Sequence, residues 1–159
     1  MREPPIRIAV CGASRPPEGL LAAANEVGRR VAEAGAVLLC GGLGGVMEAA
    51  ARGADSAGGL TIGFLPGSSA ADANPHIHIP LPTGLGEARN VLVVRTADAV
   101  IAVGGEWGTL SEVAFARKVG VPVVLLEPGR FADLGLEVAD TAEESVRLAL
   151  HHARRERMR

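Results

Sequence analysis

The chain has 159 residues, of which 48% are hydrophobic and 21% charged, and a formal net charge of -2; these values are ordinary for one globular domain and exclude a disordered chain. The slight negative charge and the scarcity of aromatic residues, with three Phe, one Trp and no Tyr, argue against a nucleic-acid-binding protein. No apolar stretch reaches membrane-spanning length and no signal-peptide pattern is present, so we expect a cytoplasmic protein without membrane contact.

The first part of the chain alternates strand-like and helix-like segments. Residues 6–11 form an apolar, β-rich run that a glycine stops, and residues 17–34 carry apolar side chains at helical spacing. The unit repeats, with a predicted strand at 36–40, a helix at 46–57 and a strand at 60–65. These strands are apolar throughout, which is typical of a sheet covered on both faces.

A longer loop interrupts this alternation at residues 66–75. It is rich in Gly, Ser, Asp and Asn, and its length exceeds that of most connections in such a fold, which favours a functional role. The segment that follows predicts a short edge strand at 76–80 and a helix at 86–96.

The last part of the chain returns to the alternating pattern. It predicts strands at 99–103 and 121–126 and helices at 109–119 and 141–154. The last of these helices opens on Thr141-Ala142-Glu143-Glu144, which has the spacing of a capping box.

Strand and helix therefore alternate over the whole length of the chain. This pattern predicts the α/β class, as a single Rossmann-like domain over residues 1–159 with a doubly wound parallel sheet, helices on both faces and right-handed crossovers. We expect residues 153–159 to be a frayed tail.

Two glycine-rich turns, at residues 41–45 and 104–109, each follow an apolar predicted strand and precede a predicted helix. Such a turn exposes backbone N–H groups beside the positive end of a helix dipole, and both features favour a phosphate. In an open α/β sheet these turns and the Gly12-Ala13-Ser14 segment meet at the carboxyl ends of the strands, where Ser14 and Thr109 offer hydroxyl groups. The alternative is that the glycines only permit tight turns.

Neither turn matches a known phosphate motif in full. No Lys-Ser or Lys-Thr pair follows, as in a P-loop, and no complete G-x-G-x-x-G is present with an acidic residue after the next strand. We therefore expect a monophosphate rather than a triphosphate or a dinucleotide.

Four segments resemble, in order, the motifs of the LONELY GUY-like superfamily, whose members were long misnamed lysine decarboxylases. They are Cys11–Ser14, Gly41–Met47, Gly86–Asn90 and Gly104–Glu112, and the resemblance extends from about residue 8 to residue 126. It implies a Rossmann-like fold, usually dimeric, and hydrolysis of the N-ribosidic bond of nucleoside 5′-monophosphates to the base and ribose 5-phosphate. The chain is most similar to a shorter bacterial branch that includes relatives of a molybdenum-cofactor carrier.

The resemblance assigns site residues by position. Arg89 and Glu112 correspond to the catalytic arginine and glutamate. The residues assigned to the ligand and its phosphate, by the resemblance and by the turns, are Gly12, Ser14, Gly41, Gly42, Gly44, Gly45, Met47, Gly104, Gly105, Gly108 and Thr109. The chain departs from the family pattern at Gly104, where the signature has Pro, at Glu106, where it has Gly, and at Asn90, where the enzymes usually have Lys.

The residue types fit this chemistry. Cleavage of a ribosidic bond builds positive charge on the sugar, which the carboxylate of Glu112 can stabilise while it positions water. Arg89 can hold a phosphate or the departing base through a planar, charge-assisted contact. Two alternatives stay open: Glu112 lies at capping-box spacing from Thr109, and Arg89 can be a solvated helix residue, as the neighbouring Arg95 suggests.

We thus predict a homodimer that binds a nucleoside monophosphate or a similar phosphorylated ligand and hydrolyses it, with neither a resident cofactor nor a metal. The competing hypothesis is a carrier without catalysis, for a molybdenum-pterin cofactor or a signalling nucleotide. A carboxylate at Glu106 repels a phosphate if it points inward, and together with Asn90 it favours the carrier.

Three other features are open to a chemical role. Cys11 and Cys40 each close a predicted strand, where a small buried side chain is the simplest interpretation. His76 and His78 lie two apart on a predicted strand, but without a third ligand nearby they indicate an ordinary surface strand. Trp107, inside the second glycine turn, can either stack on a base or pack at a dimer contact.

Overall fold

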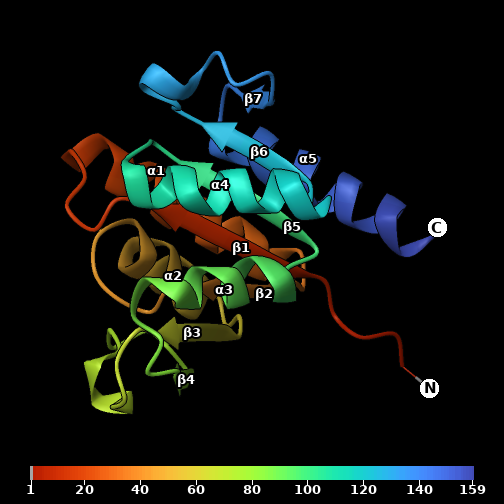
Figure 1. Ribbon diagram of the computed structural model, residues 1–159. Helices are drawn as coiled ribbons and strands as arrows, with labels where there is room; N and C mark the ends of the chain where they lie inside the picture. The colour runs from red at the N-terminus through yellow and green to blue at the C-terminus, as the bar shows by residue number, and fades with distance from the viewer. Residues whose placement is uncertain (1) are drawn as a thin grey trace.

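The computed structural model describes residues 2–159, and its centre is a seven-stranded sheet in the order β4-β3-β2-β1-β5-β6-β7 (Figure 1). All neighbouring strands are parallel. The strands are β1 (Arg7–Gly12), β2 (Val37–Cys40), β3 (Thr61–Leu65), β4 (Ile79–Pro82), β5 (Ala99–Val103), β6 (Val123–Leu126) and β7 (Glu137–Ala139). Because β2 and β5 flank β1, the chain winds outward in two directions, which confirms the predicted α/β, doubly wound parallel sheet.

Helices cover both faces of this sheet (Figure 1). One face carries α1 (Glu18–Glu33), α2 (Val46–Ser56) and α5 (Ala142–Arg157), and the other carries α3 (Asn90–Thr96) and α4 (Trp107–Val119). The short 3-10 turns are η1 (Ala70–Asp72), η2 (Gly86–Arg89) and η3 (Gly129–Phe131). In β1, Ile8 and Val10 belong to the first core and Ala9 and Cys11 to the second, since successive side chains of a strand point to opposite faces. No helix within residues 2–159 is long and apolar enough to cross a membrane.

Two glycines let α1 and α2 pack backbone to backbone. A Cβ atom on Gly28 of α1 would overlap the carbonyl oxygen of Ala50, and one on Gly53 of α2 would overlap that of Asn25. The contact fixes the position of α2, and with it the turn that joins β2 to α2.

Gly28→Ala is therefore expected to lower the free energy of unfolding by several kcal/mol, because the added methyl forces the two helices apart. Gly19→Ala, in the same helix, meets no atom within 4 Å of the new Cβ and should be neutral or stabilising by up to about 1 kcal/mol. Chemical denaturation of both variants checks the prediction, and equal midpoints would contradict it.

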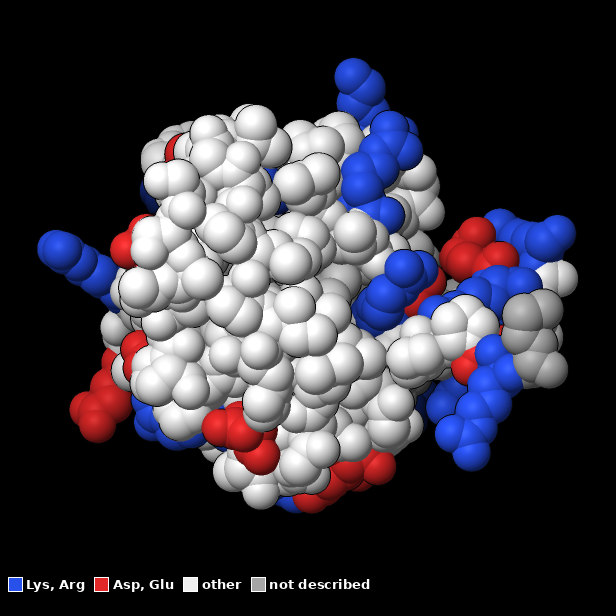
Figure 2. Space-filling view, turned by 90° about the horizontal axis from the view of Figure 1, so that it is seen from below, with Lys and Arg blue, Asp and Glu red and all other residues white. Residues whose placement is uncertain are grey.

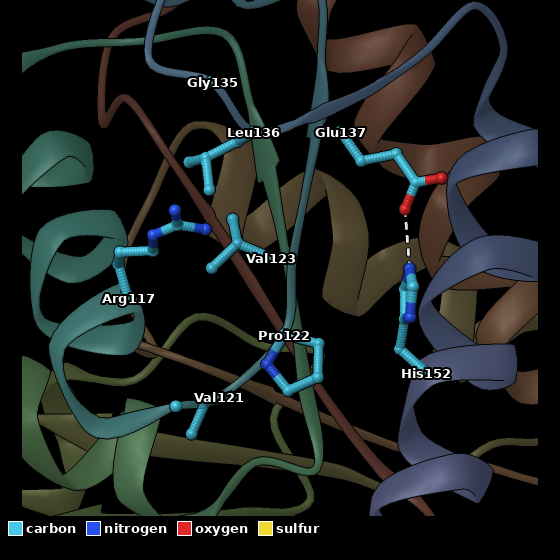
Figure 3. Close-up of a pocket in the computed structure, with 9 residues that line it drawn as sticks. Arg117, Val121, Pro122, Val123, Gly135, Leu136, Glu137 and His152 are labelled. Atoms are coloured by element: carbon cyan, nitrogen blue, oxygen red, sulfur yellow. Dashed lines mark hydrogen bonds and ion pairs between the residues drawn. The ribbon is translucent and has the colours of Figure 1, made fainter.

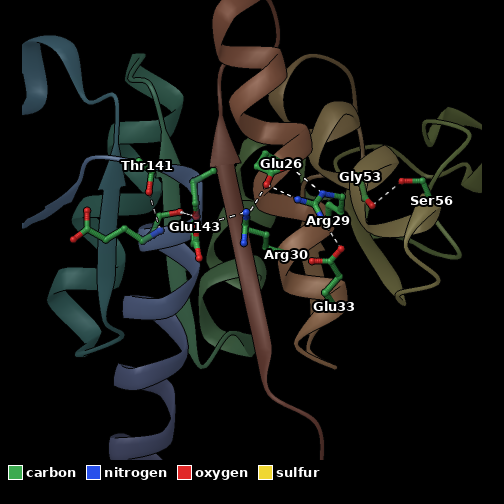
Figure 4. Close-up of polar contacts among 11 residues, drawn as sticks. Glu26, Arg29, Arg30, Glu33, Gly53, Ser56, Thr141 and Glu143 are labelled. Carbon is green, nitrogen blue, oxygen red and sulfur yellow. Dashed lines mark hydrogen bonds and ion pairs between the residues drawn. The ribbon is translucent and has the colours of Figure 1, made fainter.

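Ion pairs cover the exposed side of α1 (Figure 4). Glu26 Oε1 lies 2.6 Å from Arg29 Nη2 and 2.7 Å from Arg30 Nε, and Arg29 also pairs with Glu33. Arg30 Nη2 reaches Glu143 Oε2 of α5 at 3.6 Å, so this network joins the two helices at the surface. Pairs spaced three and four residues apart add modestly to helix stability.

The C-terminal helix differs from the prediction at its end. The segment expected to be a frayed tail continues α5 to Arg157, and Ala153 is fully buried. Arg157 donates to the carbonyl oxygens of Pro4 and Pro5 at 2.5 and 2.7 Å and pairs with Asp98 at 2.7 Å. The tail is therefore held by contacts distant in sequence, which a local pattern of charges does not reveal.

The N-terminus of α5 is capped by Thr141, as the sequence predicted. Thr141 Oγ1 accepts from the N–H of Glu144 at 3.1 Å, and the Glu144 carboxylate accepts from the N–H of Asp140 at 2.8 Å. The two bonds satisfy donors at the helix start, as in a capping box.

Both edges of the sheet differ from the prediction. The strand expected at 76–80 lies at β4, Ile79–Pro82, because His76 and His78 are held beside the sheet by Asp55 and Thr61. The opposite edge strand, β7, was not predicted, since it has three residues and exposes two of them. The helix expected at 86–96 begins as the 3-10 turn η2, and α4 begins two residues earlier than predicted.

Candidate functional site

A cavity of about 180 Å³ lies at the carboxyl ends of the central strands, beside the point where strand order reverses. This is the usual ligand position in an open α/β sheet. The loop after β1, the turn after β2, the η2 turn and the first turns of α4 all contribute to it. The lining residues are Gly12, Ala13, Ser14, Leu43, Met47, Glu87, Arg89, Glu106, Gly108, Thr109 and Glu112.

The structure brings more than half of the predicted site residues together around this cavity. Those that line it are Gly12, Ser14, Met47, Arg89, Gly108, Thr109 and Glu112, and those that do not are Gly41, Gly42, Gly44, Gly45, Gly104 and Gly105. The sequence interpretation gave no site role to Ala13, Leu43 and Glu87. Glu87 lies in a motif that carried the family resemblance, whereas an alanine and a leucine give no chemical signal.

The glycines outside the lining make room for the residues that do line it. Gly45 has φ +68°, and a Cβ on it would overlap Ala13, whose carbonyl oxygen accepts from the N–H of Val46 at 3.0 Å. A Cβ on Gly41 would lie 2.7 Å from Arg89 Nη2. The first turn thus brings β1 and the arginine close to the start of α2.

Thr109 stands out at the start of α4. Its side chain is buried, with 4% of the residue exposed, and its Oγ1 has no hydrogen-bond partner among the described residues. The N-cap residue, Glu106, makes no side-chain bond to the first turn. Since a buried hydroxyl without a partner is unfavourable, and the first N–H groups of a helix lack partners within it, this end of the cavity offers hydrogen-bond donors without protein partners, while the carboxylate residue Glu106 also lines it.

Arg89 also lines the cavity and is 5% exposed, so the alternative of a solvated helix arginine is wrong. Its Nε donates to the carbonyl oxygen of Phe64 at 2.9 Å, and its Nη1 donates to Asn90 Oδ1 and lies 3.7 Å from Glu87 Oε2. Nη2 makes no hydrogen bond to any described residue. The guanidinium group is therefore fixed in place, and Nη2, which has no hydrogen bond to a described residue, lies close to Gly41.

Asn90 explains one departure from the family pattern. Where the enzymes usually carry Lys, the amide of Asn90 accepts from Arg89 and its Nδ2 lies 3.5 Å from Ser111 Oγ. The residue positions the arginine and adds no charge of its own to the cavity.

The carboxyl group of Glu112 bonds to the thiol of Cys11, which donates to Oε2 at 2.6 Å. Glu112 therefore does not cap its own helix, and that alternative is wrong. Burial raises the pKa of Glu112 to about 7, against the opposing effects of the Cys11 bond and of Arg89. At neutral pH the group exchanges between acid and carboxylate, which suits proton transfer.

Both cysteines are buried and unpaired. Burial and the neighbouring Glu112 raise the pKa of the Cys11 thiol well above its usual range, and burial raises that of Cys40 to about 12. Neither thiol is a thiolate at neutral pH, so neither is a reactive nucleophile.

His76 and His78 both contact the carboxylate of Asp55. They precede β4 and are not part of a strand, contrary to the prediction. His76 Nδ1 lies 3.2 Å from Asp55 Oδ2, and His78 Nε2 lies 3.0 Å from Oδ1. The N–H of Thr61 donates to His78 Nδ1 at 3.2 Å, so the neutral ring carries its proton on Nε2. That nitrogen has no lone pair for a metal, and no group of three or more suitable side chains in residues 2–159 is arranged to hold a metal ion.

A second, larger cavity of about 390 Å³ lies at the amino ends of β6 and β7 (Figure 3). Arg117 of α4 faces the apolar residues Val123 and Leu136 on one side, and on the other His152 of α5 pairs with Glu137 at 2.6 Å. Its position is opposite to the usual ligand edge of such a sheet, and no buried side-chain atom without a partner lines it.

Comparisons with known proteins agree with this architecture. The sequence profile of the SLOG cluster4 family matches residues 5–158. A molybdenum cofactor binding protein from Rippkaea orientalis is 38% identical with a TM-score of 0.88, covering 94% of this chain and 98% of its own. The molybdenum cofactor carrier protein of Chlamydomonas reinhardtii is 36% identical with a TM-score of 0.84, covering 93% and 98%. An uncharacterized protein from Archaeoglobus fulgidus is 45% identical over 141 residues, 89% of this chain and 92% of its own.

Proposed function

Because the chain belongs to the SLOG cluster4 family and is similar over nearly its whole length to two proteins described as binding or carrying molybdenum cofactor, we propose that it is a carrier for a phosphorylated pterin-type cofactor. The observation that supports this most is the unpartnered, buried hydroxyl of Thr109 at the open start of α4. A phosphate oxygen accepts a hydrogen bond from that hydroxyl and from the adjacent backbone N–H groups.

Arg89 completes the proposed phosphate site. Its Nε and Nη1 are held by the protein, which leaves Nη2 as the nitrogen that bonds to the anion in this proposal. A preorganised, charge-assisted bond of this kind is stronger than a bond between neutral groups. The ligand supplies the redox-active metal and pterin, and the protein supplies binding through the phosphate.

Copurified molybdenum tests the carrier function. The protein is expressed in a host that makes the cofactor, and molybdenum is measured by elemental mass spectrometry together with the fluorescence of the oxidised pterin. We expect both in the wild-type protein and a marked loss of both in Arg89→Lys. Signals no higher than in an unrelated protein purified in parallel would contradict the proposal.

A phosphoribohydrolase is the second candidate, because Glu112, with a pKa near 7, shares the cavity with Arg89. Incubation with AMP and separation of the products by chromatography distinguish the two functions. A hydrolase releases adenine, and Glu112→Gln abolishes the release, whereas a carrier binds the phosphorylated ligand and releases nothing.

We further propose that the chain forms a homodimer through the face around the β4 edge. Between residues 57 and 86 the sequence has one charged residue, Asp72, and Figure 2 shows a broad uncharged face in the view from below. Exposed apolar side chains in or next to this segment of the sequence are Leu60, Ile79, Leu81, Leu85 and Val91. Large apolar areas on a protein surface favour association.

Leu81→Glu is expected to convert the dimer to a monomer, because it places a charge inside an apolar contact. Leu134→Glu is the matched control, since Leu134 is similarly exposed but follows η3, near the opposite edge of the sheet. Light scattering after size exclusion measures both masses. A monomeric wild-type protein, or a dimeric Leu81→Glu variant, would contradict the proposal.

A further inference from the structure

The candidate site is too small to enclose a whole ligand. Pockets that enclose drug-sized molecules have volumes of roughly 300–1,000 Å³, whereas this cavity measures about 180 Å³. If Thr109 and Arg89 hold a phosphate inside it, the larger organic part of the ligand must lie on the rim.

The one tryptophan of the chain, Trp107, is next to the cavity lining in the sequence. Trp107 is 72% exposed, and its sequence neighbours Glu106 and Gly108 both line the cavity. It lies in the first turn of α4, two residues before the unpartnered hydroxyl of Thr109. A large aromatic surface is thus exposed to solvent on a residue that lies between two lining residues in the sequence and does not itself line the cavity.

Two side chains of the η3 turn hold the indole ring. The ring of Phe131 meets it edge on, with centroids 6.4 Å apart and an angle of 63°. Arg130 Cζ lies 5.3 Å from the indole centroid and 5.2 Å from that of Phe131. With an arginine over one face and most of the residue exposed, the other face of the indole ring is open.

Gly105 is part of this arrangement. Phe131 is buried against it, and a Cβ on Gly105 would overlap the phenyl ring. The glycine that the family resemblance assigned to phosphate binding therefore makes room for the side chain that supports Trp107.

We propose that Trp107 is the stacking surface for a planar heteroaromatic group in the phosphorylated ligand, with Arg130 and Phe131 as its supports. The proposal rests on the proposed phosphate site and adds the residue that contacts the planar part of the ligand. Stacking of a base on an aromatic side chain accounts for roughly 1–3 kcal/mol, which corresponds to an affinity difference of about 5- to 150-fold.

The single tryptophan makes the test direct, because all indole fluorescence comes from position 107. AMP, which has a planar base, and ribose 5-phosphate, which lacks one, are titrated while tryptophan emission is recorded, and calorimetry measures binding independently. We expect AMP to quench the emission and ribose 5-phosphate to bind with little quenching. Trp107→Ala should weaken AMP binding about tenfold and leave ribose 5-phosphate binding within about twofold, and Trp107→Phe should restore most of the AMP affinity.

A second pair of variants tests the supports. Arg130→Gln should weaken AMP binding by a few-fold, as expected for loss of a cation–π contact. Arg117→Gln, at the far end of the same helix, is the matched control and should bind AMP as the wild type does.

The outcomes separate the two proposals. If AMP and ribose 5-phosphate both bind but Trp107→Ala binds AMP normally, the stacking proposal fails and the phosphate site stands. If neither ligand binds, the phosphate site itself fails. If Trp107→Ala changes the oligomeric mass while AMP binding is unchanged, Trp107 belongs to a contact between copies, and the stacking proposal is overturned.

Discussion

Arg89→Lys is expected to weaken the binding of phosphorylated ligands about 10- to 100-fold, as for the loss of a charge-assisted hydrogen bond of roughly 1.5–3 kcal/mol. The guanidinium group is fixed by Phe64 and Asn90, and Nη2 has no hydrogen bond to a described residue. Lysine keeps the charge but has a single ammonium group, which cannot hold both protein partners and also reach a phosphate.

Arg95→Lys provides the control for this substitution. Arg95 lies on α3 in an exposed position, with its Cζ 5.7 Å from the ring centroid of Phe115, and does not line the cavity. We expect ligand affinity in Arg95→Lys to equal that of the wild type in calorimetric titration. An equal affinity in Arg89→Lys would show that the arginine does not contact the ligand.

Glu112→Gln is expected to change how stability depends on pH. The pKa of Glu112 is raised from 4.5 to about 7 in the folded protein, so between these values the folded state binds more protons than the unfolded state. The free energy of unfolding therefore falls as pH rises through this window and stays at the lower value above it. The free energy of unfolding below both pKa values exceeds that above them by an amount on the order of 3 kcal/mol. This contribution is absent in the glutamine variant.

Thermal unfolding at several pH values measures this effect. From about pH 5 to about pH 8 the wild type should lose stability relative to Glu112→Gln. Glu87→Gln, which removes a more exposed carboxylate from the same cavity, should keep this loss of stability but at slightly lower pH, because the charge of Glu87 contributes to the raised pKa of Glu112. Parallel curves for the wild type and Glu112→Gln would contradict the assignment of the raised pKa to Glu112.

Local sequence patterns were sufficient to predict most of the fold. The core strands are short apolar runs stopped by glycine or proline, and the helices between them have regular apolar spacing. The periodicity of the apolar residues and the positions of glycine and proline therefore predict the same elements. The edges were harder, because β7 has only three residues and β4 starts late owing to the contacts of His76 and His78 with Asp55. The end of α5 was predicted wrongly, since its order depends on Arg157 reaching the N-terminal segment.

Three polar residues of the site were predictable, and its glycines were less so. Arg89, Glu112 and Thr109 do line one cavity, and the family motifs indicated them, whereas Glu87 was given no role. Several glycines of the same motifs do not line the cavity but leave space for another side chain. Gly41 does so for Arg89 and Gly105 for Phe131. A sequence records that a position must be small, but only the packed structure reveals which neighbour requires the space.

The central claim is that a phosphate binds between Arg89 and the start of α4. Calorimetric titration of ribose 5-phosphate into the wild type and into Thr109→Val tests it most directly, because valine keeps the shape of threonine and removes only the unpartnered hydroxyl. We expect binding to the wild type, an affinity about tenfold lower in the variant, and a variant at least as stable as the wild type, since an unsatisfied buried group is lost. Absence of binding to the wild type, or equal affinity in the two proteins, would contradict the account.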